Sequence, residues 1–323
     1  MAVIEVKNLT KDYHIAKKEE GLKGALKSLV INEKKIIHAV QDLSFSIEKG
    51  EIVAFIGPNG AGKSTTVKMM SGILKPTKGS VLINGLDAQK NRKKVVQDLG
   101  VVFGQRSQLN WDLRLGESFE LLKYIYLIDQ KKFEENMEIM DEILGIREII
   151  DIPVRQLSLG QRMRGDLVAA MLHSPSVLFL DEPTIGLDVE GKYAIRKFIK
   201  EINRVKGTTV ILTTHDLGDI QELCKRLIII NHGMLMEDGP LDEMVERIAP
   251  YKTLVVELYD DKAVSHDKAE LYSIEGNVAK YRFMKKEITA AQMIQDLSAK
   301  MAIKDVAIEE ANIDDVIRIA YRQ

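Results

Sequence analysis

The sequence of 323 residues has a single cysteine, Cys224, and no long apolar run. One cysteine excludes an intrachain disulfide framework and suits a reducing cytosol. A membrane-spanning helix needs about 20 consecutive apolar residues, and neither residues 1–7 nor any later stretch approaches that length. If this protein acts at a membrane, we therefore expect another polypeptide to provide the crossing.

The sequence also lacks a strong excess of charge of either sign. Lysine and arginine total 46 against 48 acidic residues, which gives a formal net charge of −2. Proteins that bind nucleic acid as their main partner usually carry a basic surplus, so we expect no nucleic-acid partner here. The length suits one large domain and a smaller one, which we place at residues 1–245 and 246–323.

A phosphate-binding loop is the clearest motif in the sequence. An apolar run, Ile52 to Ile56, is followed by the pattern G-x-x-x-x-G-K-[ST] and then by a helical sequence. Glycines let the backbone N–H groups turn inward, Lys63 supplies a positive charge for phosphates, and the Ser64 hydroxyl can ligate Mg²⁺. A glycine-rich turn that only joins strand to helix would not need that lysine and hydroxyl. The loop consists of Gly57, Pro58, Asn59, Gly60, Ala61, Gly62, Lys63, Ser64 and Thr65.

A second set of candidate site residues follows an apolar strand at 177–181. This strand shows no polar alternation, which is typical of a parallel strand buried on both faces. Asp181 and Glu182 stand at its end, where carboxylates need a cation or a chemical role. We interpret Asp181 as the anchor for Mg²⁺, either directly or through an intervening ligand, and Glu182 as the base that polarises the attacking water. The alternative is an acidic pair that only starts a helix.

Polar residues also follow two further strands. Gln105 comes directly after the strand at 99–103, and His215 ends the buried strand at 208–214. Because α/β sheets bind ligands at the carboxyl ends of their strands, both residues are candidates for the site. Tyr13 near the end of the strands in 2–15 is, on the residues alone, an exposed strand tyrosine.

The chain is predicted to alternate strands and helices, with two insertions. Residues 2–15 predict two strands, 36–40 and 44–48 two more, and 227–237 a hairpin. Between 116 and 146 the apolar spacing is helical, which places a helical subdomain at about 105–172. The tail predicts strands at 253–258, 278–283 and 303–308, a further strand without defined bounds before 278, and helices at 287–300 and 313–321. The expected fold class is therefore α/β, with a small C-terminal α+β domain.

A basic, amphipathic insertion is expected at about 16–35. Five apolar residues recur there at helical spacing, and lysines flank them. Such a helix could lie on an anionic membrane surface, grip a partner helix, or pack on its own domain. The five are Leu22, Ala25, Leu26, Leu29 and Val30.

With these motifs in order, residues 1–245 resemble the nucleotide-binding subunit of an ATP-binding cassette (ABC) transporter. The match rests on several independent motifs: the Walker A loop (57–65), the Q-loop at Gln105, the signature (157–161), the Walker B strand (177–182), the D-loop (186–188) and the switch histidine His215. This resemblance implies a P-loop fold with antiparallel β and helical subdomains, ATP and Mg²⁺ as cofactors, and Tyr13 stacked on adenine. It also assigns Gln105 to the metal and the γ-phosphate.

The resemblance further implies a head-to-tail dimer, in which the signature of one chain covers the ATP held by the other. Ser158, Gly160, Gln161 and Asp188 would then complete the partner's site. Leu159 departs from the glycine most common there, a variation familiar among exporters with a separate membrane subunit. We therefore expect an ATPase that drives export, peripheral on the cytoplasmic face of the cell membrane. The alternatives are an importer ATPase whose tail senses a metabolite, and a non-transport ABC protein acting on ribosomes or DNA.

Overall fold

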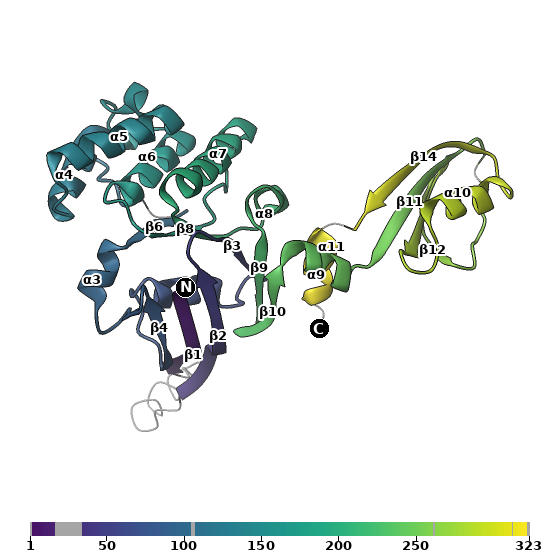
Figure 1. The fold of residues 1–323 in the computed structure, drawn as a ribbon, viewed down its shortest axis with the longest axis horizontal. Helices are drawn as coiled ribbons and strands as arrows, with labels where there is room; N and C mark the ends of the chain where they lie inside the picture. The colour runs from purple at the N-terminus through teal and green to yellow at the C-terminus, as the bar shows by residue number, and fades with distance from the viewer. Residues whose placement is uncertain (1, 17–33, 105–106, 261, 312, 322–323) are drawn as a thin grey trace, which may run out of the picture. The chain divides into compact units, whose positions relative to one another are not determined.

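A computed structural model describes residues 2–16, 34–104, 107–260, 262–311 and 313–321 (Figure 1). The chain divides into two compact units, Met1–Asp238 and Gly239–Gln323. This division precedes the predicted boundary at 245/246, which lies inside helix α9 (Leu241–Ile248). The predicted insertion helix at 22–30 lies outside the described residues, and so does Gln105.

A six-stranded sheet forms the centre of the first unit, in the order β10-β9-β3-β8-β7-β6. Five of these strands run parallel: β3 (Ile52–Ile56), β6 (Leu99–Phe103), β7 (Val177–Asp181), β8 (Thr209–Thr213) and β9 (Arg226–Asn231). β10 (Met234–Pro240) follows β9 after a short turn, which confirms the predicted hairpin. The carboxyl ends of β3, β7 and β8 lead directly into predicted site residues, so the sheet places these residues along one edge.

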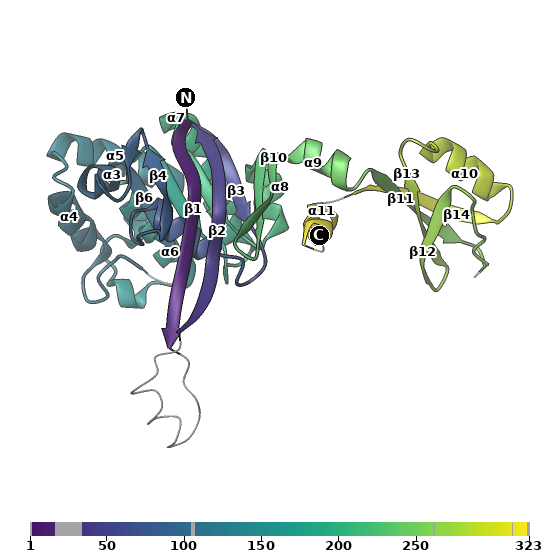
Figure 2. The same ribbon diagram turned by 90° about the horizontal axis from the view of Figure 1, so that it is seen from below.

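A second sheet has the order β2-β1-β4-β5 and is antiparallel. β1 (Ala2–Ala16) and β2 (Lys34–Glu48) form the long ribbon seen in Figure 2. β4 (Lys78–Ile83) pairs with β1, and β5 (Leu86–Asp87) pairs with β4. The prediction of two strands in each half of the ribbon is wrong. Register shifts interrupt the polar alternation, and Asn8 and Asp42 take positive φ, but the pairing continues through these bulges.

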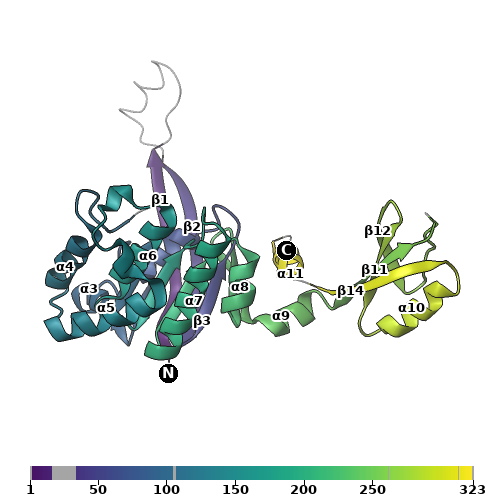
Figure 3. The same ribbon diagram turned by 90° about the horizontal axis from the view of Figure 1, so that it is seen from above.

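Helices complete the first unit. α2 (Lys63–Met70) follows the phosphate loop, and its residues join one apolar core with both sheets, where the rings of Phe45 and Phe55 lie 5.8 Å apart. The predicted helical subdomain contains α4 (Leu115–Ile125), α5 (Gln130–Leu144) and α6 (Leu159–Met171). Figure 3 shows α7 (Val189–Lys206) beside α8 (Leu217–Leu223). The remaining elements are α3 (Arg92–Gln97), η1 (Ile146–Ile149) and η2 (Val154–Gln156).

The second unit is an antiparallel sheet in the order β12-β13-β11-β14. Its strands are β11 (Tyr251–Leu258), β12 (Ala269–Glu275), β13 (Val278–Met284) and β14 (Ile303–Glu310). α10 (Ala290–Ser298) packs on the sheet, and α11 (Ile313–Ala320) contacts α9. β12 corresponds to the strand that is predicted without bounds before 278, and α9 is a helix that the sequence does not predict. Within the described ranges, no helix is long and apolar enough to span a membrane.

Candidate functional site

The phosphate loop turns between β3 and α2 through two glycines with positive φ, Gly60 at +84° and Gly62 at +101°. A Cβ atom at Gly62 would lie 2.4 Å from the carbonyl oxygen of Ala39. Only glycine therefore fits there. Within the loop the Ala61 N–H donates to the Pro58 oxygen at 3.0 Å. Asn59 and Ser64 are exposed, while Thr65 is half-buried in the first turn of α2.

Lys63 lies folded over this loop. Its ammonium donates to the Gly57 oxygen at 2.6 Å and to the Pro58 oxygen at 3.2 Å. Burial lowers the pKa of Lys63, and the negative charges of Glu182 and Asp181 oppose that shift. The nearby carboxylates thus favour a charged ammonium at the point where phosphates would enter.

Ser64, in the first turn of α2, contacts Asp181 at the end of β7. The Ser64 hydroxyl donates to Asp181 Oδ2 at 3.3 Å, and the Thr213 hydroxyl donates to Oδ1 at 2.5 Å. A hydroxyl and a carboxylate are hard oxygen donors, the type that Mg²⁺ takes from a protein while phosphates and water supply the rest. The donor set therefore fits Mg²⁺.

Glu182 and His215 meet at the same sheet edge. Glu182 Oε1 lies 3.1 Å from His215 Nε2, which in turn lies 3.5 Å from Lys63 Nζ. Glu182 has φ +54° and donates its N–H to the backbone oxygen of Thr213 at 2.9 Å. A carboxylate and an imidazole are thus held beside the phosphate loop.

A hollow of about 400 Å³ opens beside these groups and is lined by Ser64, Lys68, Asp181 and Glu182, among others. Gly104, just before Gln105, also lines it. A Cβ at Gly104 would lie 2.8 Å from the Glu182 oxygen, so β6 approaches β7 closely where it ends.

The signature residues line a separate hollow of about 490 Å³, together with the D-loop. Ser158 caps α6: its hydroxyl accepts the Gln161 N–H at 3.2 Å, and the Gln161 side chain accepts the Ser158 N–H at 2.9 Å. Asp188 caps α7 by accepting the Gly191 N–H at 2.8 Å. Gly160 lines the hollow as well. Of the described residues, those that line it include none from the phosphate loop.

Tyr13 lies on β1 opposite Ile37 and is 38% exposed. The Lys11 ammonium lies 5.3 Å from the centroid of its ring. Tyr13 lines neither of the two hollows described above. The structure does not bring Tyr13 into the cluster around Glu182.

Two groups around the site were not predicted from the sequence. Thr213, which holds Asp181, is paired with it in register across β7 and β8, so the shared end of two buried strands was the available signal. Asp166 of α6 is buried and accepts the Ser107 hydroxyl at 2.8 Å and the Gln108 N–H at 3.1 Å. It ties the signature helix to the segment after Gln105.

A strand, a phosphate loop and a helix, with an acidic pair ending a neighbouring strand, define a P-loop nucleotide-binding protein. Comparison with known proteins identifies the family within this class. A family model described as "ABC transporter" matches residues 40–185. ABC transporter ATP-binding protein NatA of Bacillus subtilis is 31% identical over 67% of this chain and 87% of its own length. The uncharacterized ABC transporter ATP-binding protein YhcH of the same organism is 32% identical over 78% and 81%. The chain belongs to the ABC transporter ATP-binding proteins.

Solved structures of ABC transporter cassettes share this fold. A dimeric ATP-binding cassette in a post-hydrolysis state with ADP and Pi superposes with a TM-score of 0.61 and 26% identity, covering 74% of this chain and 98% of that one. The fold is thus that of an ABC cassette, and the chain is an ATPase subunit of an ABC transporter.

The names of relatives do not fix the direction of transport. Bacitracin transport ATP-binding protein BcrA of Bacillus licheniformis is 32% identical over 66% of this chain and 68% of BcrA. Methionine import ATP-binding protein MetN 1 of Oenococcus oeni is 30% identical over 66% of this chain and 62% of MetN 1. Proteins named for import and for antibiotic transport are therefore similarly close.

Proposed function

We propose that the chain drives export through a separate integral membrane subunit by hydrolysing ATP, and that it acts peripherally at the cytoplasmic face of the membrane. The observation that carries the hydrolytic role is the 3.1 Å approach of Glu182 Oε1 to His215 Nε2 beside Lys63. Export is supported by Leu159 in the signature and by the likeness to a bacitracin transport protein.

In this proposal the phosphate loop holds the β and γ phosphates, with Lys63 as the fixed charge. Ser64 and Asp181, together with Gln105, would hold Mg²⁺, which would supply positive charge beside the phosphates. Glu182 orients and deprotonates the attacking water. His215 and Gln105 respond to the γ-phosphate.

We further propose that two copies pair so that Ser158, Gly160, Gln161 and Asp188 of one complete the site of the other. A helix start favours negative charge, because its first N–H groups have no partner within the helix. The signature of one copy can therefore grip a γ-phosphate held by its partner's loop. Adenine would stack on Tyr13.

An importer is the second candidate, because MetN 1 is named for import and the second unit has a core of its own. Reconstitution with the membrane subunit in proteoliposomes, with ATP supplied on one side, decides the direction. Substrate movement away from the side that holds this chain supports export, and movement toward it overturns export.

The catalytic assignment is tested by Glu182→Gln in the full chain. A general base contributes about 10²–10⁴-fold, so we expect turnover to fall by that factor while ATP affinity is retained. Glu201→Gln, in the last turns of α7 where the carboxylate pairs with Arg204 at 2.7 Å, is the control and should hydrolyse ATP normally. Near-normal turnover by Glu182→Gln would remove Glu182 from the role of base.

A further inference from the structure

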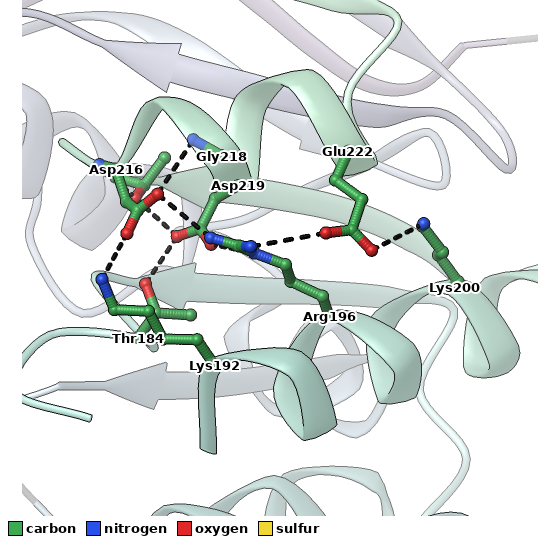
Figure 4. A network of polar contacts seen from close by, with 9 residues as sticks. Thr184, Lys192, Arg196, Lys200, Asp216, Gly218, Asp219 and Glu222 are labelled. Atoms are coloured by element: carbon green, nitrogen blue, oxygen red, sulfur yellow. Dashed lines mark hydrogen bonds and ion pairs between the residues drawn. The ribbon is translucent and has the colours of Figure 1, made fainter. Parts of the chain in front are cut away.

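Asp219, in the first turn of α8, is a fully buried carboxylate outside the nucleotide motifs. Its Oδ2 accepts the hydroxyls of Thr184 at 2.5 Å and of Thr214 at 2.8 Å. Its Oδ1 accepts Arg196 Nε at 2.7 Å. A buried carboxylate needs such partners, and here they come from three separate segments of the chain (Figure 4).

Arg196 of α7 joins this carboxylate to Asp216, the cap of α8. Its Nη2 donates to Asp216 Oδ1 at 3.0 Å, and Lys192 donates to Oδ2 at 2.5 Å. Asp216 also accepts the Gly218 N–H at 2.9 Å. Arg196 thereby fixes both acidic residues to one face of α7.

The residues that make these contacts flank His215 and Glu182 in the sequence. Thr214 precedes it, Asp216 follows it, and Thr184 lies two residues after Glu182. The imidazole itself is 48% exposed and contacts Glu182 and Lys63. The backbone on both sides of His215 is thus anchored to α7 and to the segment after Glu182, while its ring remains at the site.

The anchoring residues of α7 lie on one stripe that begins at the D-loop. Asp188, Lys192 and Arg196 are spaced four residues apart, which places them on one helix face. Asp188 caps the helix and lines the hollow beside the signature. A displacement of this end of α7 would therefore reach the His215 segment through Arg196.

We infer that Asp219 and Arg196 form a positioning pair, which holds His215 against Glu182 and transmits the position of α7 to it. This inference deepens the proposed function and rests on the role given there to His215. Neither Asp219 nor Arg196 lines the hollow beside Glu182, so the effect of the pair on turnover passes through His215.

Asp219→Asn tests the inference, because the amide keeps the size and an acceptor but removes the charge that pairs with Arg196. We expect ATP turnover at saturation to fall at least tenfold, with KM for ATP changed less than twofold. Glu222→Gln is the matched control: it removes another acidic partner of Arg196, at 3.4 Å, that has no contact with Thr184 or Thr214 among those described. Its turnover should stay within twofold of the unchanged protein.

A double-mutant cycle with His215→Ala separates positioning from general loosening. If Asp219 acts through His215, Asp219→Asn lowers turnover no further in the His215→Ala background. Thr184→Val, which removes one hydrogen bond to the same carboxylate, replaces Asp219→Asn in the cycle if that variant does not fold. Thermal unfolding of each variant is measured alongside.

The outcomes are distinguishable. Multiplicative losses in the double variant, normal turnover in the folded single variant, or an equal loss in Glu222→Gln would each overturn the positioning pair. Normal turnover in His215→Ala would instead overturn the role of His215 in the proposed function, and the inference would fall with it. A loss in His215→Ala with none in Asp219→Asn would leave the proposed function standing and overturn the positioning pair alone.

Discussion

Glu182 shows how a single residue is held in an unfavourable conformation at the site. A glutamate at φ +54° costs on the order of 1–3 kcal/mol. Its N–H is fixed by the backbone oxygen and hydroxyl of Thr213, at 2.9 and 3.2 Å. The neighbouring strand therefore keeps the carboxylate turned toward His215, where a relaxed strand end would not.

The raised pKa of a second single residue, Asp166, predicts how the stability of the protein changes with pH. Burial raises its pKa from 3.8 to about 6, although hydrogen bonds from Ser107 and Gln108 lower it. Between those values the folded state binds the proton more tightly than the unfolded chain does. Its contribution to stability therefore grows as the pH falls from 7 to about 4, by up to about 3 kcal/mol.

Asp166→Asn removes that contribution but keeps an acceptor for both hydrogen bonds. At pH 7 we expect the free energy of unfolding of the variant to be at least that of the unchanged protein. At pH 5 we expect it to be lower, relative to the unchanged protein, than it is at pH 7. Urea unfolding of the first unit at both pH values measures the difference. A difference that does not change with pH would contradict the assignment of Asp166 as the titrating group.

At the scale of elements, two helices begin with the same device. α6 and α10 each start with a capping box, Ser158 with Gln161 and Thr289 with Gln292. The local chemistry is matched, but α6 starts in the signature hollow and α10 in the second unit. This pair therefore separates the energetic role of a cap from a role in catalysis.

We predict that Ser158→Ala and Thr289→Ala each destabilise their own unit by about 1 kcal/mol, the usual loss for a removed cap. Only Ser158→Ala should lower ATP turnover, at least tenfold, because its hydroxyl is proposed to bind the γ-phosphate. Steady-state hydrolysis and thermal unfolding measure the two effects. Equal turnover losses in both variants would show that the effect comes from destabilisation.

At the scale of the whole molecule, one chain carries two separate hollows, one lined by the signature and the other beside the phosphate loop, and none of the described residues lines both. A nucleotide bridging two copies would connect them, and it would stabilise the dimer by its affinity for the closed state. The site in a single copy would then be half of the functional unit.

The full chain with Glu182→Gln should therefore form a dimer with Mg-ATP and return to a monomer with Mg-ADP. Size-exclusion chromatography with light scattering measures the mass in each state. The Ser158→Ala change in the same background removes one bridging contact and should weaken the ATP-bound dimer. The same mass with both nucleotides would reject a bridge through the γ-phosphate.

The sequence by itself determined the parts of this protein that depend on neighbouring residues. The phosphate loop, the strand ending at Asp181, α7 and the hairpin after Leu227 follow from local pattern, because turn chemistry and periodicity act over a few residues. The resemblance to ABC cassettes, which the relatives confirm, rested on the order of such local motifs.

Tertiary structure decided what depends on residues far apart in the chain. The continuity of β1 and β2 through their bulges was hidden, because pairing with a neighbouring strand holds a strand together where its own alternation fails. Thr213 ends a buried strand that the sequence predicts, but its bond to Asp181 depends on which strands are neighbours, as does the pairing of Arg196 with Asp219. These contacts join segments that only the folded sheet brings together, and no spacing along the chain encodes them.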